Sequence, residues 1–139
     1  INKDLNFIEL GNLYAKRDWG YAKEYVEAMW KMLQKNEPDD YVIATGKTYS
    51  IKDFINMATK YLKMDVKWVG KGLNEKLINN KDKKTIIKIN PKFFRPSEVN
   101  ILIGSPDKAK KKLNWEPKTN INQLIKIMID EEMKYYSDL

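Results

Sequence analysis

The chain has 139 residues, of which 42% are hydrophobic and 12% aromatic, and its formal net charge is +7. This length fits one domain, and this composition is typical of a globular protein. Cysteine and histidine are both absent, which excludes disulfides, thiol nucleophiles and the commonest general base and metal ligand. No apolar run approaches the roughly 20 residues of a membrane span. We therefore expect a cytoplasmic protein with no membrane segment and no metal site.

The first half of the chain alternates between predicted strands and predicted helices. Residues 6–10 read as a short strand that runs into a Gly-Asn turn. Apolar residues at helical spacing predict an amphipathic helix over 21–34. The apolar run 41–45 is typical of a strand that is buried on both faces of a parallel sheet. Ser50, followed by Asp53, resembles a capping box at the start of the next helix.

The second half continues the alternation. Residues 66–69 and 86–89 are short apolar runs that predict strands, and the polar, lysine-rich stretch 70–85 between them predicts a mobile loop. Ser105, followed by proline and an acid, marks a helix start. The last helix begins after Thr119.

These elements predict an α/β fold, with short strands alternating with amphipathic helices in one compact unit over 1–139. Several of the strands that read as buried have too few partners in this sequence to cover them. The chain also opens on Ile1 and not on methionine. We interpret it as part of a longer protein.

The basic residues are spread along the whole chain. The densest runs, 81–84 and 108–112, lack the interleaved aromatic residues that single-strand nucleic-acid binders use for stacking. We therefore do not expect nucleic acid to be the partner. Only Arg17 and Arg95 are arginines among the 26 basic residues. A guanidinium grips a phosphate or carboxylate at two points, so the pair indicates an anionic ligand; structural ion pairs with Asp18 or Glu98 remain the alternative.

No complete catalytic site is visible in these residues. A dinucleotide-binding enzyme needs a Gly-rich turn such as G-x-G-x-x-G, and the six glycines never approach that spacing. None of the eight tyrosines is followed by a lysine four residues later, so a Tyr-x-x-x-Lys proton-transfer pair is also absent. The chain therefore reads as the binding part of a protein whose chemistry lies elsewhere.

Five segments resemble the GDP-mannose 4,6-dehydratase family, within the extended short-chain dehydrogenase/reductases. They match in order and approximate spacing, and they cover nearly the whole chain: residues 10–30, 41–46, 94–99, 104–109 and 113–117. The resemblance implies the carboxy-terminal, substrate-binding part of a Rossmann-type enzyme. It also implies a lyase that converts GDP-mannose to GDP-4-keto-6-deoxymannose, the precursor of GDP-fucose. NADP would be bound by an amino-terminal part that is missing here, so this part alone would be inactive and would bind no cofactor.

The resemblance also implies roles for five residues. Arg17 and Arg95 would bind the diphosphate of the GDP-sugar. Glu98 would accept hydrogen bonds from the ribose or base, or would hold Arg95 in place. Gly11 and Asn12 would line the guanosine site, mostly through their backbone. Dimers or tetramers are usual in the family, so a homo-oligomer is expected.

Other residues in the same motifs have simpler explanations. The helical spacing of Tyr25, Met29 and Trp30 favours a place in the core, and we expect Trp19 there too. Asp18 is better explained as a helix cap or arginine partner than as a catalytic acid. Two alternatives stay open for the chain as a whole, namely half of another nucleotide-sugar epimerase or dehydratase and a basic nucleic-acid-binding module.

Overall fold

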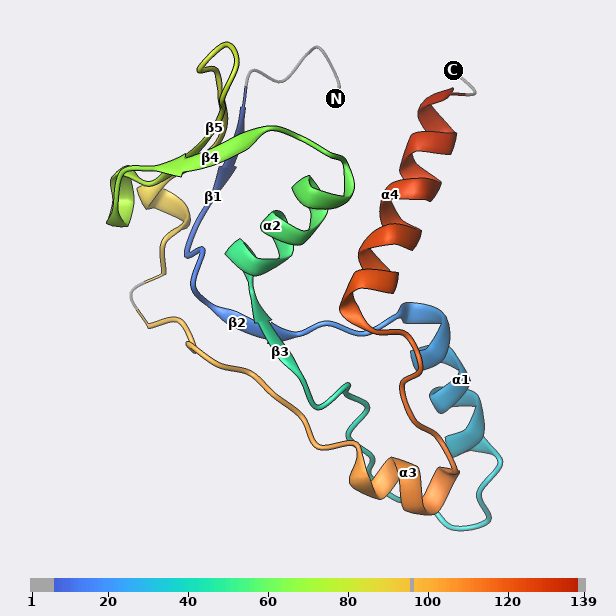
Figure 1. The fold of residues 1–139 in the computed structure, drawn as a ribbon. Helices are drawn as coiled ribbons and strands as arrows, with labels where there is room; N and C mark the ends of the chain where they lie inside the picture. The colour runs from blue at the N-terminus through green and yellow to red at the C-terminus, as the bar shows by residue number, and fades with distance from the viewer. Residues whose placement is uncertain (1–6, 96, 138–139) are drawn as a thin grey trace. The chain divides into compact units, whose positions relative to one another are not determined.

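The computed structural model describes residues 7–95 and 97–137, which fall into two compact units (Figure 1). The first unit comprises Ile1–Ala15 and Ser50–Asn100, and the second comprises Lys16–Tyr49 and Ile101–Leu139. The prediction of one compact unit was therefore wrong. Each unit is assembled from two segments that are distant in the sequence. Local periodicity carries no information about which distant segments pack together.

The first unit is built on a four-stranded sheet. β1 pairs in parallel with β6, while β6 with β5 and β5 with β4 are antiparallel. The order is β1-β6-β5-β4, with bounds Ile8–Leu10 for β1, Thr85–Ile89 for β6, Lys76–Asn79 for β5 and Val66–Val69 for β4. Three of these strands confirm predictions made from apolar runs.

Leu77 of β5 lies opposite Ile87 of β6, and both side chains are buried in the core of this unit. Helix α2, Ile51–Tyr61, begins with the predicted capping box, in which Ser50 and Asp53 each accept the other's backbone N–H. Because this box satisfies two N–H groups that the helix itself leaves unpaired, it fixes where α2 starts.

The stretch 70–85 is not the irregular loop that its polarity predicted. It contains a short 3-10 helix, η1, over Gly72–Asn74, then β5, and it ends on the first residue of β6. β5 escaped detection because only two of its four residues, Leu77 and Ile78, are apolar. Both are buried all the same, since tertiary pairing outweighs weak local propensity.

The second unit contains three helices and a two-stranded sheet. Their bounds are Lys16–Asp18 for β2, Ala22–Leu33 for α1, Thr48–Ser50 for β3, Asp107–Leu113 for α3 and Ile121–Ser137 for α4. The last residue of β3 is counted with the first unit. The predicted helices are thus confirmed to within one or two residues at their starts, which is the usual uncertainty of helix ends.

A small core joins α1 to α3 in this unit. Ala28 and Ala109 are completely buried, and Trp115 is nearly so. Two alanines at a helix contact allow a close approach of the backbones. The Trp115 indole N–H donates to the Glu24 carbonyl at 2.9 Å, so the one polar atom of this side chain is satisfied inside the core.

Two expectations for this unit were wrong. Residues 41–45 form no strand, because they have no ladder partner among the described residues. Met29 and Trp30 were expected in the core, but they are 57% and 61% exposed. Both lie away from the helix face that buries Ala28, so apolar side chains of α1 are also exposed outside its covered face.

Candidate functional site

The sheet of the first unit brings two distant candidate segments to one edge. β1 leads into Gly11 and Asn12, and β6 leads through the 3-10 helix η2, Pro91–Phe93, to Arg95. Because β1 and β6 are parallel, both segments leave from the carboxyl ends of neighbouring strands. Such edges are where open α/β sheets place their ligands.

Asn90 links the segment after β6 to the end of β1 through hydrogen bonds. Its backbone N–H donates to the Leu10 carbonyl at 2.8 Å, and its side-chain amide donates to Glu9 at 2.9 Å. The side-chain oxygen of Asn90 also accepts from the Lys92 N–H and so caps η2. One residue therefore sets both the start of η2 and its distance from the end of β1.

Gly11 lies against the backbone that precedes Arg95. A Cβ atom built on Gly11 would lie 2.4 Å from the Phe93 carbonyl oxygen, well inside van der Waals contact. Glycine is therefore required here for a close backbone approach, and not for an unusual φ angle. This contact brings the predicted pair Gly11 and Asn12 alongside the Phe93–Arg95 segment.

Asn12 forms an Asx turn. Its side-chain oxygen accepts the Tyr14 backbone N–H at 2.9 Å, which is the hydrogen bond that asparagine commonly makes two residues along the chain. The assignment of oxygen and nitrogen is fixed by this contact, because a backbone N–H needs an acceptor. The amide nitrogen of Asn12 makes no hydrogen bond within 7–95 and 97–137, so it is an available donor.

Arg95 is exposed, and its guanidinium has no hydrogen bond or ion pair in the described part of the chain. The Glu98 N–H donates to the Arg95 carbonyl at 3.3 Å, which turns the backbone and leaves Glu98 half-buried. An ion pair between the Arg95 and Glu98 side chains, the structural alternative for this arginine, is therefore not observed. Arg95 is available for a ligand.

Arg17 belongs to the second unit, on β2. It is partly buried, and one of its terminal nitrogens donates to the Lys16 carbonyl at 2.8 Å. Because Arg95 lies in the other unit, the predicted grip of both arginines on one diphosphate stays a prediction.

Asp18 has a structural role, as expected, although it caps no helix. Its carboxylate accepts the backbone N–H of Thr45 at 2.8 Å and of Gly46 at 2.9 Å, together with the Thr45 hydroxyl at 2.6 Å. The residue that caps α1 is Tyr21, without a side-chain bond. With three donors on its oxygens, Asp18 holds a turn.

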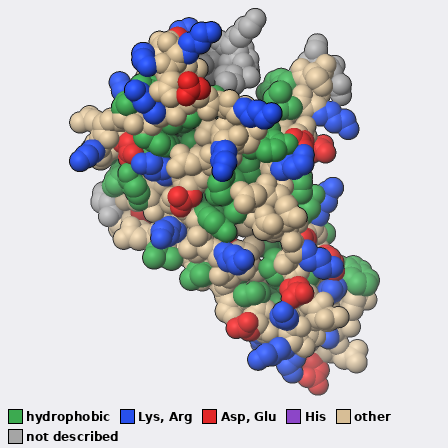
Figure 2. Space-filling view, in the orientation of Figure 1, with side chains coloured by type: hydrophobic (Ala, Val, Ile, Leu, Met, Phe, Trp, Pro, Cys, Tyr) green, Lys and Arg blue, Asp and Glu red, His purple; other side chains and the backbone are tan. Residues whose placement is uncertain are grey.

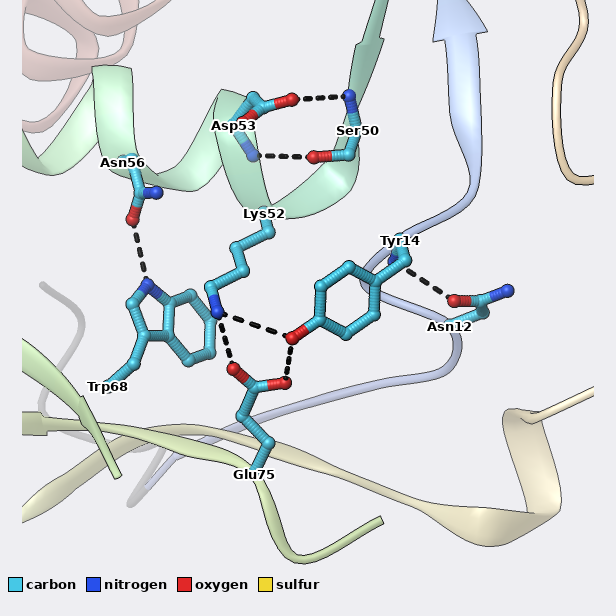
Figure 3. Close-up of polar contacts among 8 residues, drawn as sticks. All are labelled: Asn12, Tyr14, Ser50, Lys52, Asp53, Asn56, Trp68 and Glu75. Atoms are coloured by element: carbon cyan, nitrogen blue, oxygen red, sulfur yellow. Dashed lines mark hydrogen bonds and ion pairs between the residues drawn. The ribbon is translucent and has the colours of Figure 1, made fainter. Parts of the chain in front are cut away.

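A buried ion pair next to the Gly11–Asn12 turn escaped the sequence analysis (Figure 3). Glu75 is only 4% exposed, and its carboxylate accepts from the Lys52 ammonium at 2.5 Å and from the Tyr14 hydroxyl at 2.7 Å. The ammonium also lies 5.3 Å from the centre of the Tyr14 ring and 5.0 Å from that of Trp68. No local pattern in the sequence signals this contact, because Tyr14 and Glu75 are 61 positions apart.

The pair stays charged despite its burial. Burial alone would raise the pKa of Glu75, but the hydrogen bonds from Lys52 and Tyr14 outweigh it and hold that pKa below its ordinary value. The hydrogen bond to Glu75 raises the pKa of Lys52, against the smaller opposing effect of burial. The three side chains therefore form one charged, hydrogen-bonded cluster at neutral pH.

On the face shown in Figure 2, lysine and arginine side chains form no continuous stripe, because acidic and other side chains separate them. Among the residues that the structure describes, no helix is long and apolar enough to cross a membrane. Over the same residues, no group of three acidic side chains gathers where a metal ion could bind.

The comparison with known proteins decides the family. The profile of the family described as GDP-mannose 4,6 dehydratase matches residues 1–128. The chain belongs to this family. It is 45% identical over 133 residues to GDP-mannose 4,6 dehydratase from Drosophila melanogaster, which covers 96% of this chain and 34% of the relative. It is 49% identical over 126 residues to GDP-mannose 4,6 dehydratase 2 from Caenorhabditis elegans, covering 91% and 33%. The chain thus spans about a third of the length of these curated relatives.

Solved structures confirm the expected fold class. The UDP-glucose 4-epimerase from Thermotoga maritima, solved with UDP-glucose, superposes with a TM-score of 0.70 at 20% identity, over 94% of this chain and 36% of that one. RMD from Pseudomonas aeruginosa, solved with NADPH, gives 0.61 at 18% identity, over 88% and 34%. At these identities the likeness shows the fold alone.

Proposed function

We propose that this chain is the nucleotide-sugar-binding part of a lyase that converts GDP-mannose to GDP-4-keto-6-deoxymannose. The observation that carries the proposal is the edge where the Gly11–Asn12 turn lies against the segment leading to Arg95, whose guanidinium has no partner among the described residues, in a member of the GDP-mannose 4,6-dehydratase family. Arg95 and Arg17 would bind the diphosphate. Glu98 would accept hydrogen bonds from the ribose or base.

The chemistry of this edge suits a nucleoside diphosphate. An arginine that is already exposed and unpaired loses no internal hydrogen bond when it binds, so its charge-assisted contact with phosphate is not offset by a broken one. This feature favours an anionic ligand.

The cofactor has no fitting site in these residues. Holding the diphosphate of NADP on a helix N-terminus requires a Gly-rich turn between strand and helix, and this sequence contains none. We therefore propose that NADP binds to other residues of the complete enzyme and that these 139 residues alone do not turn over GDP-mannose. Homo-oligomerisation stays a prediction of the family resemblance, and a cytoplasmic location stays a prediction from composition.

The proposal can be tested by measuring how much GDP and UDP each raise the unfolding temperature of the complete enzyme. GDP should raise its unfolding temperature more than UDP does at the same concentration, and equal protection would remove the guanine-specific claim in favour of another nucleotide-sugar enzyme. Arg95→Lys and Arg17→Lys should each weaken GDP about tenfold, because a lysine keeps the charge and loses the two-point grip. Unchanged affinity would make these arginines structural.

Two controls accompany this experiment. Lys84→Met removes a charge from a side chain that is 81% exposed, so unchanged GDP affinity in this variant shows that net charge alone is not the cause. DNA binding should be weak at physiological salt. Tight binding with a steep salt dependence would instead favour the nucleic-acid module.

A further inference from the structure

We propose that Tyr14 is a positioning residue for nucleotide binding, and that it acts by aiming the side-chain amide of Asn12 at the bound nucleotide. The inference rests on the proposed function and adds a donor and its support to the site. Asn12 was predicted to contribute through its backbone. The structure instead makes its side-chain N–H group a candidate donor to an oxygen or nitrogen acceptor of the nucleotide.

Tyr14 is held in place from two sides. Its hydroxyl donates to the buried carboxylate of Glu75 at 2.7 Å and accepts from Lys52 at 3.4 Å. The backbone around it is fixed to the start of α2, because the Lys52 N–H donates to the Leu13 carbonyl at 2.9 Å and the Ile51 N–H donates to the Ala15 carbonyl at 3.3 Å. The backbone of Tyr14 therefore has little freedom relative to α2.

This fixed backbone orients Asn12. The Tyr14 N–H donates to the Asn12 side-chain oxygen at 2.9 Å, so the amide plane is set and its nitrogen points away from Tyr14, as Figure 3 shows. The preceding residue, Gly11, is confined by the Phe93 carbonyl. Because the Asn12 side chain is already held between Gly11 and Tyr14, it loses little conformational entropy when a ligand binds. This preorganisation favours binding.

The buried Lys52–Glu75 ion pair carries a larger desolvation cost than an exposed ion pair would. Glu75 is a carboxylate taken almost completely out of water, and replacing such pairs by apolar residues is often neutral or stabilising. Its two hydrogen-bond partners come from the Gly11–Ala15 segment and from the start of α2. The cluster thus meets the site segment at one residue, Tyr14, and this geometry assigns it the role of holding that segment.

Asn12→Asp separates the two roles of Asn12. Aspartate keeps the oxygen that accepts the Tyr14 N–H, so the Asx turn and the unfolding temperature should be preserved. It loses the N–H donor and adds a negative charge, so the affinity of the complete enzyme for GDP should fall at least tenfold. GDP binding that matches wild type in this variant would overturn the inference.

Tyr14→Phe tests the positioning role. Removing the hydroxyl should weaken GDP binding about threefold to tenfold and speed hydrogen exchange at the Tyr14 amide. In an Asn12→Asp background the same change should have no further effect on affinity, because Tyr14 acts through the Asn12 amide. Additive losses would mean that Tyr14 affects binding by another route and would overturn the inference.

A matched control comes from the second unit. There Lys108 pairs with Asp39 at 2.6 Å and lies 5.3 Å from the centre of the Tyr41 ring, which repeats the lysine, carboxylate and tyrosine set without the Asn12 turn. Lys108→Met should leave GDP affinity unchanged. If wild type itself fails to bind GDP, the proposed function falls and this inference with it. If wild type binds and the Asn12 and Tyr14 variants bind equally well, only this inference falls.

Discussion

Replacing Lys52 by methionine should destabilise the first unit by an amount that the structure bounds. The substitution leaves the Glu75 carboxylate with the Tyr14 hydroxyl alone, at a position that is 4% exposed. Breaking a buried pair in this way costs about 3 to 5 kcal/mol. Because the Lys52 side chain is itself 24% exposed, water can reach part of the vacated space, and we expect about 3 kcal/mol, the lower end of that range.

Urea unfolding at pH 7 measures this change. Lys108→Met is the control, since its Asp39 partner is 41% exposed and can regain water, and it should leave the unfolding midpoint unchanged. We attribute the expected loss of stability in Lys52→Met to the burial of the Glu75 carboxylate. A Lys52→Met variant no less stable than Lys108→Met would therefore refute the reasoning.

The pH dependence of the unfolding free energy tests the same reasoning independently. The pKa of Glu75 is lowered in the folded protein, so its contribution is present above the unfolded pKa of about 4.3 and is lost as the pH falls through the lower, folded pKa. The pKa of Lys52 is raised, so its contribution is present at neutral pH and is lost only as the pH rises through the folded value. In Lys52→Met, burial of Glu75 is largely unopposed, and its pKa should rise. The deficit relative to wild type should therefore shrink as the pH falls from 7 toward 4, and parallel profiles would contradict this.

Substitutions at two further positions test the contacts that shape the segments near the candidate residues. Gly11→Ala should destabilise by about 2 kcal/mol and weaken GDP binding, because the new methyl group meets the Phe93 carbonyl and not a mobile side chain; a fully stable variant in urea unfolding would show that the two segments separate easily. Asp18→Ala should cost about 2 kcal/mol by leaving the N–H groups of Thr45 and Gly46 without their acceptor. Asp18→Asn, which keeps one oxygen, should cost less, and equal losses would argue against the hydrogen bonds as the cause.

Much of the fold could be predicted because its signals are local. The apolar spacing that predicted a helix over 21–34 corresponds to α1 at Ala22–Leu33 with Tyr21 and Gln34 as its caps. The Ser50 capping box is a four-residue pattern, and it is present as predicted. In each case the interactions that define the element lie within one or two helical turns, so a window of sequence contains them all.

The errors arose where long-range contacts decide the outcome. Residues 41–45 have the composition of a buried strand, but a strand exists only where another backbone pairs with it, and none does among the described residues. β5 has the opposite character, a weak local pattern that becomes a strand because β4 and β6 pair with both of its edges. The cluster of Tyr14, Lys52 and Glu75 joins residues 61 positions apart. No local pattern marks such a contact.

Hydrogen-bond saturation distinguishes the polar groups that we expect to stabilise the fold from those that we propose bind a ligand. Asp18 accepts three hydrogen bonds, and Glu24 accepts the Thr119 N–H at 3.0 Å and the Thr119 hydroxyl at 2.7 Å. In contrast, the Arg95 guanidinium and the Asn12 amide nitrogen have no partner in the described part of the chain. A saturated group loses internal bonds when it is replaced, so its substitution should lower stability. An unsaturated group loses nothing until a ligand is present, so Arg95→Lys and Asn12→Asp should leave the unfolding temperature unchanged and reduce only the protection that GDP confers.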